Sequence, residues 1–146
     1  MQGNTRPIII GDPVRTTGSL SLLALVLVLA HLAFLLIRVE GGHPHVFGLA
    51  RTFDLNEEGN VPTFFSAALL LLCACLFAII WLLKRQQHTS FTKHWLILAL
   101  VFVYLSLDEA SALHELVSMN MKRFWDTGWF FYPWVIPGTI AVVVFA

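Results

Sequence analysis

The sequence predicts an all-α, polytopic integral membrane protein: a single membrane domain with four transmembrane helices. Of its 146 residues, 58% are hydrophobic and only 12% are charged, whereas soluble domains average about 45–50% apolar and about 25% charged residues. A helix needs roughly 20 mostly apolar residues to cross a bilayer, and a soluble bundle of this length could not shield four such helices from water. The four apolar segments are residues 19–37, 62–83, 95–116 and 129–146.

The first two segments read as uninterrupted spans. His31 is the only strongly polar residue within 19–37, and this run is too long for the apolar region of a signal peptide, so we expect a retained helix. The second segment starts at Pro62, a residue suited to the first position of a helix, and is followed by Lys84 and Arg85.

The third and fourth segments are less regular. The third is apolar through Leu107 and then becomes ionic. In the fourth, Pro133 and Pro137 predict a kinked or late-starting helix, because each proline removes a backbone donor. The fourth segment is still apolar at Ala146, and we expect this span to be truncated.

The charged residues predict the orientation in the membrane by a small margin, and they exclude nucleic acid as a partner. Nine Lys and Arg balance nine Asp and Glu, so no net positive field favours nucleic acid. If the four segments alternate across the membrane, the side that holds the N-terminus carries five basic residues and the other side four, which predicts a cytoplasmic N-terminus. The basic residues on the N-terminal side are Arg6, Arg15, Lys84, Arg85 and Lys93, and those on the other side are Arg38, Arg51, Lys122 and Arg123.

The candidate functional cluster is ionic and lies at the end of the third segment. It comprises Asp108, Glu109, His114 and Glu115. Ionisable residues within a span cost roughly 2.5–3.5 kcal/mol each and are therefore functional candidates by default. On one continuous helix Asp108 and Glu115 share a face, while Glu109 and His114 point elsewhere, so the four form no ready-made ligand set. His31 is expected at a similar depth and is a natural partner for Asp108 or Glu109.

Several interpretations of this cluster stay open. The groups can simply tie helices together, as polar pairs in membranes often do. His114, Glu115 and Asp108 are weak candidate ligands for zinc or iron, and the same groups suit a proton relay. His31 could ligate a pigment, although Leu27 stands where such helices usually carry a small residue. We therefore predict no particular cofactor.

Two smaller features have structural interpretations. Cys73 and Cys75 diverge on a helix and so cannot share one metal ion, which indicates ordinary packing residues. Between Phe47 and Leu55, apolar and polar residues interleave in a way that suits a short interfacial helix.

From Phe53 to about Leu116, the chain resembles a group of polytopic membrane proteins of bacteria and cyanobacteria that has no assigned activity. The likeness covers under half of the chain, and its most specific part is Asp-Glu-Ala followed four residues later by His-Glu. This resemblance implies a multi-pass protein of the bacterial inner membrane and licenses no catalytic role. The segments that carry it are Phe53-Asp54-Leu55-Asn56, Asn60-Val61-Pro62-Thr63, Leu105-Ser106-Leu107-Asp108-Glu109-Ala110 and His114-Glu115.

Two functions follow from the sequence, and we favour the first. A small non-catalytic accessory or assembly subunit, embedded in a larger respiratory or photosynthetic-type membrane complex, fits the short loops and the lack of any cofactor motif. Its partners would be the lipid bilayer and other membrane subunits. The alternative is a membrane-embedded enzyme, or a proton or metal site, built on His31 and the ionic cluster of the third segment.

Overall fold

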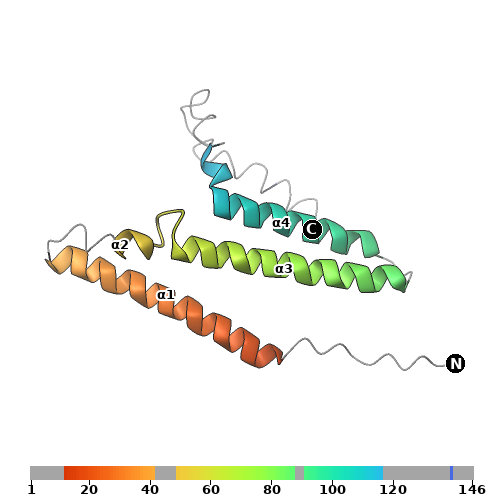
Figure 1. Ribbon diagram of the computed structural model, residues 1–146, viewed down its shortest axis with the longest axis horizontal. Helices are drawn as coiled ribbons and strands as arrows, with labels where there is room; N and C mark the ends of the chain where they lie inside the picture. The colour runs from red at the N-terminus through yellow and green to blue at the C-terminus, as the bar shows by residue number, and fades with distance from the viewer. Residues whose placement is uncertain (1–11, 42–48, 88–90, 117–138, 140–146) are drawn as a thin grey trace. The chain divides into compact units, whose positions relative to one another are not determined.

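The computed structural model describes residues 12–41, 49–87, 91–116 and 139, and these residues are helical or connect helices. The helices are α1 (Pro13–Gly41), α2 (Leu49–Thr52), α3 (Val61–Gln86) and α4 (Thr92–Ser111), drawn in Figure 1. No strand occurs in this part of the chain, which confirms the all-α class. The chain divides into two compact units, Met1–Glu57 and Glu58–Ala146, called here the α1–α2 unit and the α3–α4 unit.

Three of these helices, α1, α3 and α4, are long and apolar enough to cross a membrane. They correspond to the first three predicted spans. The fourth predicted span, residues 129–146, lies outside the described residues except for Thr139, and it stays a prediction.

The start of α1 is set by a polar cap. Pro13 occupies the first turn, and the backbone N–H of Val14 donates to Oδ1 of Asp12 over 3.0 Å. The hydroxyl of Thr16 donates to the carbonyl oxygen of Asp12, also over 3.0 Å. The helix therefore begins six residues before the predicted span at residue 19, because capping extends it through a polar turn that hydropathy alone omits.

The start of α3 is also capped by a side chain. Oδ1 of Asn60 accepts hydrogen bonds from the backbone N–H of Thr63 (3.1 Å) and from its hydroxyl (3.0 Å). Gly59 precedes the cap with a positive φ of 70°, a conformation that glycine adopts without steric cost. The chain can thus turn directly into the helix at Val61, one residue before the predicted start.

The end of α4 differs from the prediction. The helix stops at Ser111, and Ala112 adopts the left-handed conformation (φ 52°, ψ 37°). Placing an alanine there costs about 1–2 kcal/mol. Because the predicted span ran to residue 116, the assumption that Asp108 and Glu115 share one face of a continuous helix was wrong.

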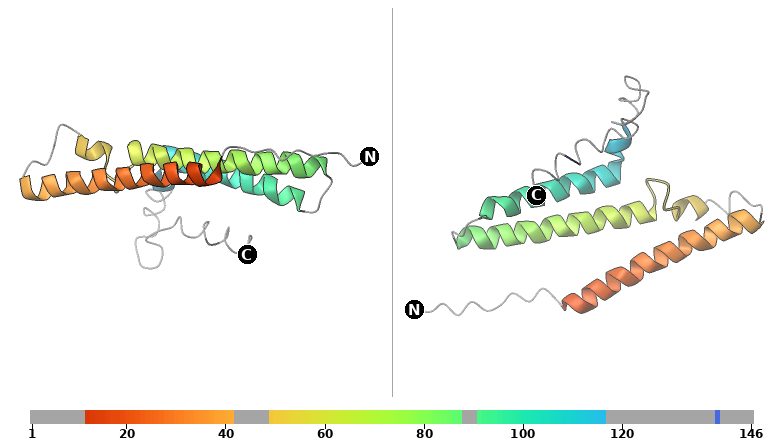
Figure 2. Two further views of the ribbon diagram at one scale, coloured as in Figure 1. Left: turned by 90° about the horizontal axis from the view of Figure 1, so that it is seen from below. Right: turned by 180° about the vertical axis from the view of Figure 1, so that it is seen from behind.

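Small residues form the contact between α3 and α4, which lie side by side in Figures 1 and 2. The buried residues on the two helices include Ala67 and Ala74 on α3 and Ala99 and Ser106 on α4. Each pair is seven residues apart and so occupies one helical face. Small side chains let the two backbones approach closely, which is how helices associate in lipid.

One hydrogen bond and an aromatic cluster complete this contact. The hydroxyl of Ser106 donates to the carbonyl oxygen of Ala67 over 2.8 Å in a buried position. Toward the other end of the helix pair, the ring of Phe77 lies 5.0 Å from that of Phe102, edge to face, and 6.0 Å from that of Trp95. The pair is therefore joined along most of its length.

In the α1–α2 unit, the contact is confined to one end of the long helix. The ring of Phe34 on α1 stacks on that of Phe53, just after α2, with centroids 5.8 Å apart. The short helix α2 lies within the segment where the sequence suggested an interfacial helix, although it spans only four residues.

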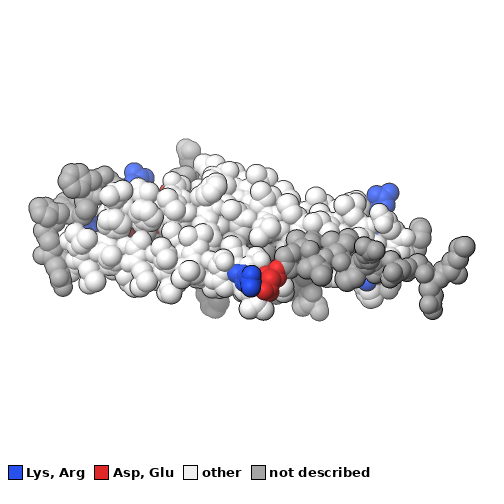
Figure 3. All heavy atoms as spheres, turned by 60° about the horizontal axis from the view of Figure 1, so that its bottom comes forward, with Lys and Arg blue, Asp and Glu red and all other residues white. Residues whose placement is uncertain are grey.

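Most large apolar side chains of the described helices are exposed. They include leucines along the whole length of α1 and residues on the outer sides of α3 and α4. On the face shown in Figure 3, Lys, Arg, Asp and Glu are few and uncharged surface predominates. An apolar surface of this extent indicates a lipid environment.

Candidate functional site

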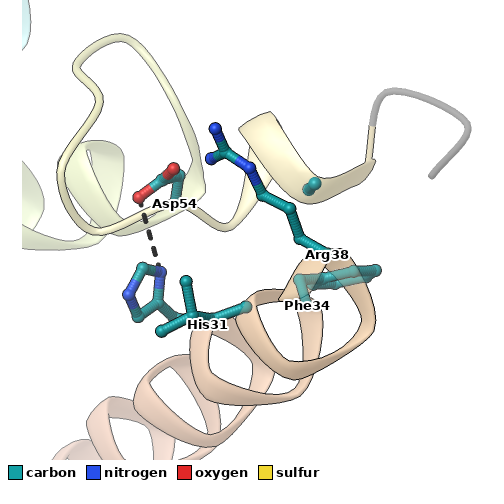
Figure 4. A pocket seen from close by; sticks show the side chains of 6 residues that line it. His31, Phe34, Arg38 and Asp54 are labelled. Carbon is teal, nitrogen blue, oxygen red and sulfur yellow. Dashed lines mark ion pairs between the residues drawn. The ribbon is translucent and has the colours of Figure 1, made fainter. Parts of the chain in front are cut away.

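His31 lies near the end of α1 that contacts α2, and its partner is a residue of the same unit. Its Nδ1 atom is 3.5 Å from Oδ1 of Asp54, as Figure 4 shows, and accepts a hydrogen bond from the backbone N–H of Leu55 over 3.2 Å. A nitrogen that accepts from an N–H carries a lone pair, so Nδ1 acts as the acceptor in this hydrogen bond, while the Asp54 carboxylate lies beside the same atom.

A small hollow lies beside this histidine. It is lined by Phe34, Arg38 and Ala50 together with His31 and Asp54, and its volume of about 20 Å³ is enough for about one water molecule. Figure 4 shows the Arg38 side chain extending from α1 along this hollow.

His114 has a different environment, at the turn that follows α4. Its backbone N–H donates to Oδ1 of Asp108 over 2.8 Å, and its ring Nδ1 lies 3.3 Å from Oδ2 of the same carboxylate. Its Nε2 is 2.9 Å from Oε1 of Glu58, just before α3. The left-handed Ala112 reverses the chain so that His114 returns toward Asp108.

The ring of His114 therefore has a carboxylate oxygen at each nitrogen. A neutral imidazole has one N–H donor and one lone pair, and the lone pair would face a carboxylate oxygen. The doubly protonated imidazolium carries an N–H at each nitrogen. Its Nε2 lies within hydrogen-bond distance of Glu58, whereas its Nδ1 attracts the Asp108 carboxylate by charge alone, since this buried atom makes no hydrogen bond among the described residues. The second oxygen of the Glu58 carboxylate, Oε2, is buried and has no hydrogen-bond partner among the described residues.

This geometry does not suit a single metal ion. Asp108 and Glu58 approach different nitrogens of the ring, so the ring itself separates the two carboxylates. Across the described ranges, no group of three or more His, Cys, Asp or Glu side chains is placed to hold a metal. The proposed ligand set of His114, Glu115 and Asp108 gains no support, since the Glu115 side chain is exposed.

A family model described as a domain of unknown function (DUF8692) matches residues 20–146. The chain belongs to this family. The match includes both histidine sites and extends well beyond the segment on which the sequence resemblance was based. Comparisons with curated proteins and with solved structures gave no match.

The structure brings together only part of the predicted cluster. Asp108 and His114 are in contact within the α3–α4 unit, and His31 has Asp54 as a neighbour within its own unit. The expected pairing of His31 with Asp108 or Glu109 stays a prediction. Within the described residues, the side chains of Glu109 and Glu115 make no hydrogen bond or ion pair.

Two partners were missed from the sequence, Asp54 and Glu58. Both belong to the acidic stretch between the first two spans, and Asp54 is part of the Phe-Asp-Leu-Asn segment that carries the resemblance. The sequence did offer one indication of these partners, because this short stretch places acidic residues close to the start of the second predicted span.

Proposed function

We propose that this DUF8692 protein is a small non-catalytic accessory or assembly subunit embedded in a larger membrane complex of the respiratory or photosynthetic type. The observation that supports this proposal best is that polar side chains form hydrogen bonds to nearby backbone groups. Asp108 accepts from the backbone N–H that follows α4, and His31 accepts from the backbone N–H of Leu55. Groups used in this way organise chain ends, as polar residues in membranes commonly do.

The exposed apolar surface is a second support. Leucines of α1 such as Leu22, Leu29 and Leu36 are each more than half exposed. Lipid covers such a surface in an isolated protein, and neighbouring subunits cover part of it in a complex. Helices with few buried residues, as in the described part of the chain, suit the second arrangement, because neighbours then supply the packing that they lack.

We further propose four spans in a bacterial inner membrane, with the N-terminus in the cytoplasm. The described part of the N-terminal side contributes Arg15, and the end of α3 contributes Lys84 and Arg85. Fusion of a reporter that is active only in the cytoplasm tests this orientation, and reporter activity at the N-terminus is the expected result.

In vivo photo-crosslinking tests the subunit proposal. A photoreactive residue at Leu29 or Leu36 should cross-link to the same neighbouring protein, whereas one at Leu27, which is 7% exposed, should not. Deleting the protein should then reduce the amount of the intact complex that contains this neighbour, measured on native gels. A lone 16.4 kDa monomer after mild extraction, with no protein cross-link from either exposed position, would contradict the proposal.

One observation favours the alternative, a proton or metal site or a membrane-embedded enzyme. It is the run of carboxylate, imidazole and carboxylate formed by Asp108, His114 and Glu58, with one buried carboxylate oxygen unsatisfied. Metal analysis of protein purified without chelators tests the metal version. A stoichiometric metal that is lost in both Asp108→Asn and His114→Ala would replace the subunit proposal.

A further inference from the structure

The contacts of His114 join two parts of the α3–α4 unit that are distant in the sequence. Through Asp108 the histidine is attached to the last full turns of α4, and through Glu58 it is attached to the segment that enters α3. Glu58 stands two residues before Asn60, the residue that caps α3. The histidine therefore connects the end of one helix to the start of the other.

We propose that Glu58, His114 and Asp108 form a proton-dependent clasp, closed while His114 is an imidazolium and open once the ring is neutral. In the closed form, Nε2–H donates to Glu58, and Nδ1–H lies 3.3 Å from Oδ2 of Asp108, which it attracts by charge without a hydrogen bond. When the ring loses one proton, a lone pair replaces one donor and faces a carboxylate oxygen. The attraction at that nitrogen then becomes a repulsion.

Two partners of the His114 ring in the described part of the chain, Glu58 and Asp108, are both acidic, and Glu57, next to Glu58, is paired with Arg51 over 3.8 Å. The first turns of α3, residues 61–66, carry no ionisable side chain. The remaining ionisable groups near this end of α4 are the carboxylates of Glu109 and Glu115, which add negative charge and make no ion pair there. The proton on His114 is thus the positive charge that holds the two carboxylates of the clasp together.

Because these contacts are partly buried, the charge on the ring changes their strength. The side chains of Glu58, Asp108 and His114 are each about one-third exposed or less, so water screens their charges only in part. The strained conformation of Ala112 also depends on the clasp, because the Asp108 carboxylate holds the His114 backbone N–H that follows it. Opening of the clasp should therefore loosen residues 112–116 and the residues just before α3.

Two measurements on the full chain in lipid nanodiscs test this proposal together. Nitrogen-15 NMR of histidine-labelled protein, assigned by loss of the signal in His114→Gln, reports whether both ring nitrogens carry protons. Hydrogen–deuterium exchange, corrected for the intrinsic effect of pH, reports the protection of the amides in residues 108–116. Both are recorded from pH 5 to pH 9, which covers the range where imidazoles ordinarily change charge.

The proposal predicts a doubly protonated ring at the acidic end of this range. Amide protection should fall about tenfold as that ring loses its proton, since hydrogen bonds to charged groups contribute at least this factor. In His114→Gln the protection should be low and independent of pH. The matched control is His94→Gln, because His94 is an exposed histidine at the other end of α4 and its loss should leave the response intact.

Two further variants each remove the charge of one carboxylate but keep its hydrogen-bond acceptor. In Asp108→Asn the side-chain oxygen still accepts from the backbone N–H of His114, and in Glu58→Gln the amide oxygen can still accept from Nε2. Each variant should fold and yet lose most of the pH response. A neutral His114 ring at every pH, or protection that persists after the ring is deprotonated, would overturn the proposal.

Discussion

The two units use a histidine in opposite ways. In the α1–α2 unit, Nδ1 of His31 accepts a hydrogen bond from the backbone N–H of Leu55, with one carboxylate, Asp54, beside it. In the α3–α4 unit, the ring of His114 accepts nothing from the backbone and has a carboxylate oxygen within 3.3 Å of each nitrogen. The comparison shows that the neighbours of a histidine decide its structural role: His31 accepts from the backbone just after α2, while His114 lies between two carboxylates just beyond α4.

The units also differ in what joins their helices. A row of small residues runs along the contact between α3 and α4, whereas α1 and α2 are joined by one aromatic stack and the contacts of His31. We therefore expect the α3–α4 unit to be sensitive to side-chain size and the α1–α2 unit to the loss of individual contacts.

Ala74→Leu is expected to have the largest effect. Ala74 is only 2% exposed, and a larger side chain there would push α3 and α4 apart, at a cost of about 2–3 kcal/mol. Unfolding of the helices by SDS in mixed micelles, followed by circular dichroism, measures this cost. The matched control is Cys75→Leu, next to it and exposed, which should change the stability little. Equal losses of stability from the two substitutions would show that the α3–α4 contact is not especially sensitive to side-chain size, and would contradict this difference between the units.

Phe53→Ala is expected to come next, at about 1–2 kcal/mol, through loss of the stack on Phe34. Because this contact belongs to the α1–α2 unit, hydrogen exchange should accelerate in residues 49–55 and stay unchanged across Ala67 and Ser106. Phe64→Ala serves as the control, since this ring is 76% exposed. Faster exchange throughout α3 and α4 would show that the two units do not respond separately.

His31→Phe sharpens the comparison of the histidines. The phenyl ring keeps the volume but cannot accept from the Leu55 backbone N–H, so we expect a local loss of about 0.5–1 kcal/mol. His31→Gln retains an acceptor and should lose less. Exchange of the Leu55 amide measures both, and an equal loss would mean that the ring contributes by packing alone.

Arg15→Gln is expected to have the smallest effect. Nε of Arg15 lies 3.4 Å from the Asp12 carboxylate, but its side chain is 88% exposed, and pairs of this kind contribute less than about 1 kcal/mol. The stability in SDS should stay within about 0.5 kcal/mol of the original at both low and high salt. A larger, salt-dependent loss would show that exposed charges contribute as much here as the partly buried groups around His114.

The sequence predicted the three described long helices because the length of an apolar run is a direct measure of a membrane span. The ends of these helices were predicted less well. Asp12 and Asn60 are recognisable caps that extend α1 and place the start of α3, but the left-handed Ala112 was not predictable, because alanine has no preference for that conformation.

The partners of the histidines were beyond the sequence for a related reason. Helical spacing relates residues within one helix, and it placed Asp108 near His114 only by proximity in the chain. Asp54 and Glu58 reach their histidines through turns and helix packing, which depend on the whole fold. Spacing on a continuous helix also misassigned Glu115, because α4 ends before it.

The hydrogen bond from Ser106 to the Ala67 carbonyl sets the register of the two antiparallel helices. Sliding α4 along α3 by one helical turn would strand this hydroxyl among hydrocarbon and bring bulky rings such as Phe77 against positions that now hold alanine. The helix pair thus has one preferred alignment, fixed by a single buried hydroxyl and the small residues beside it.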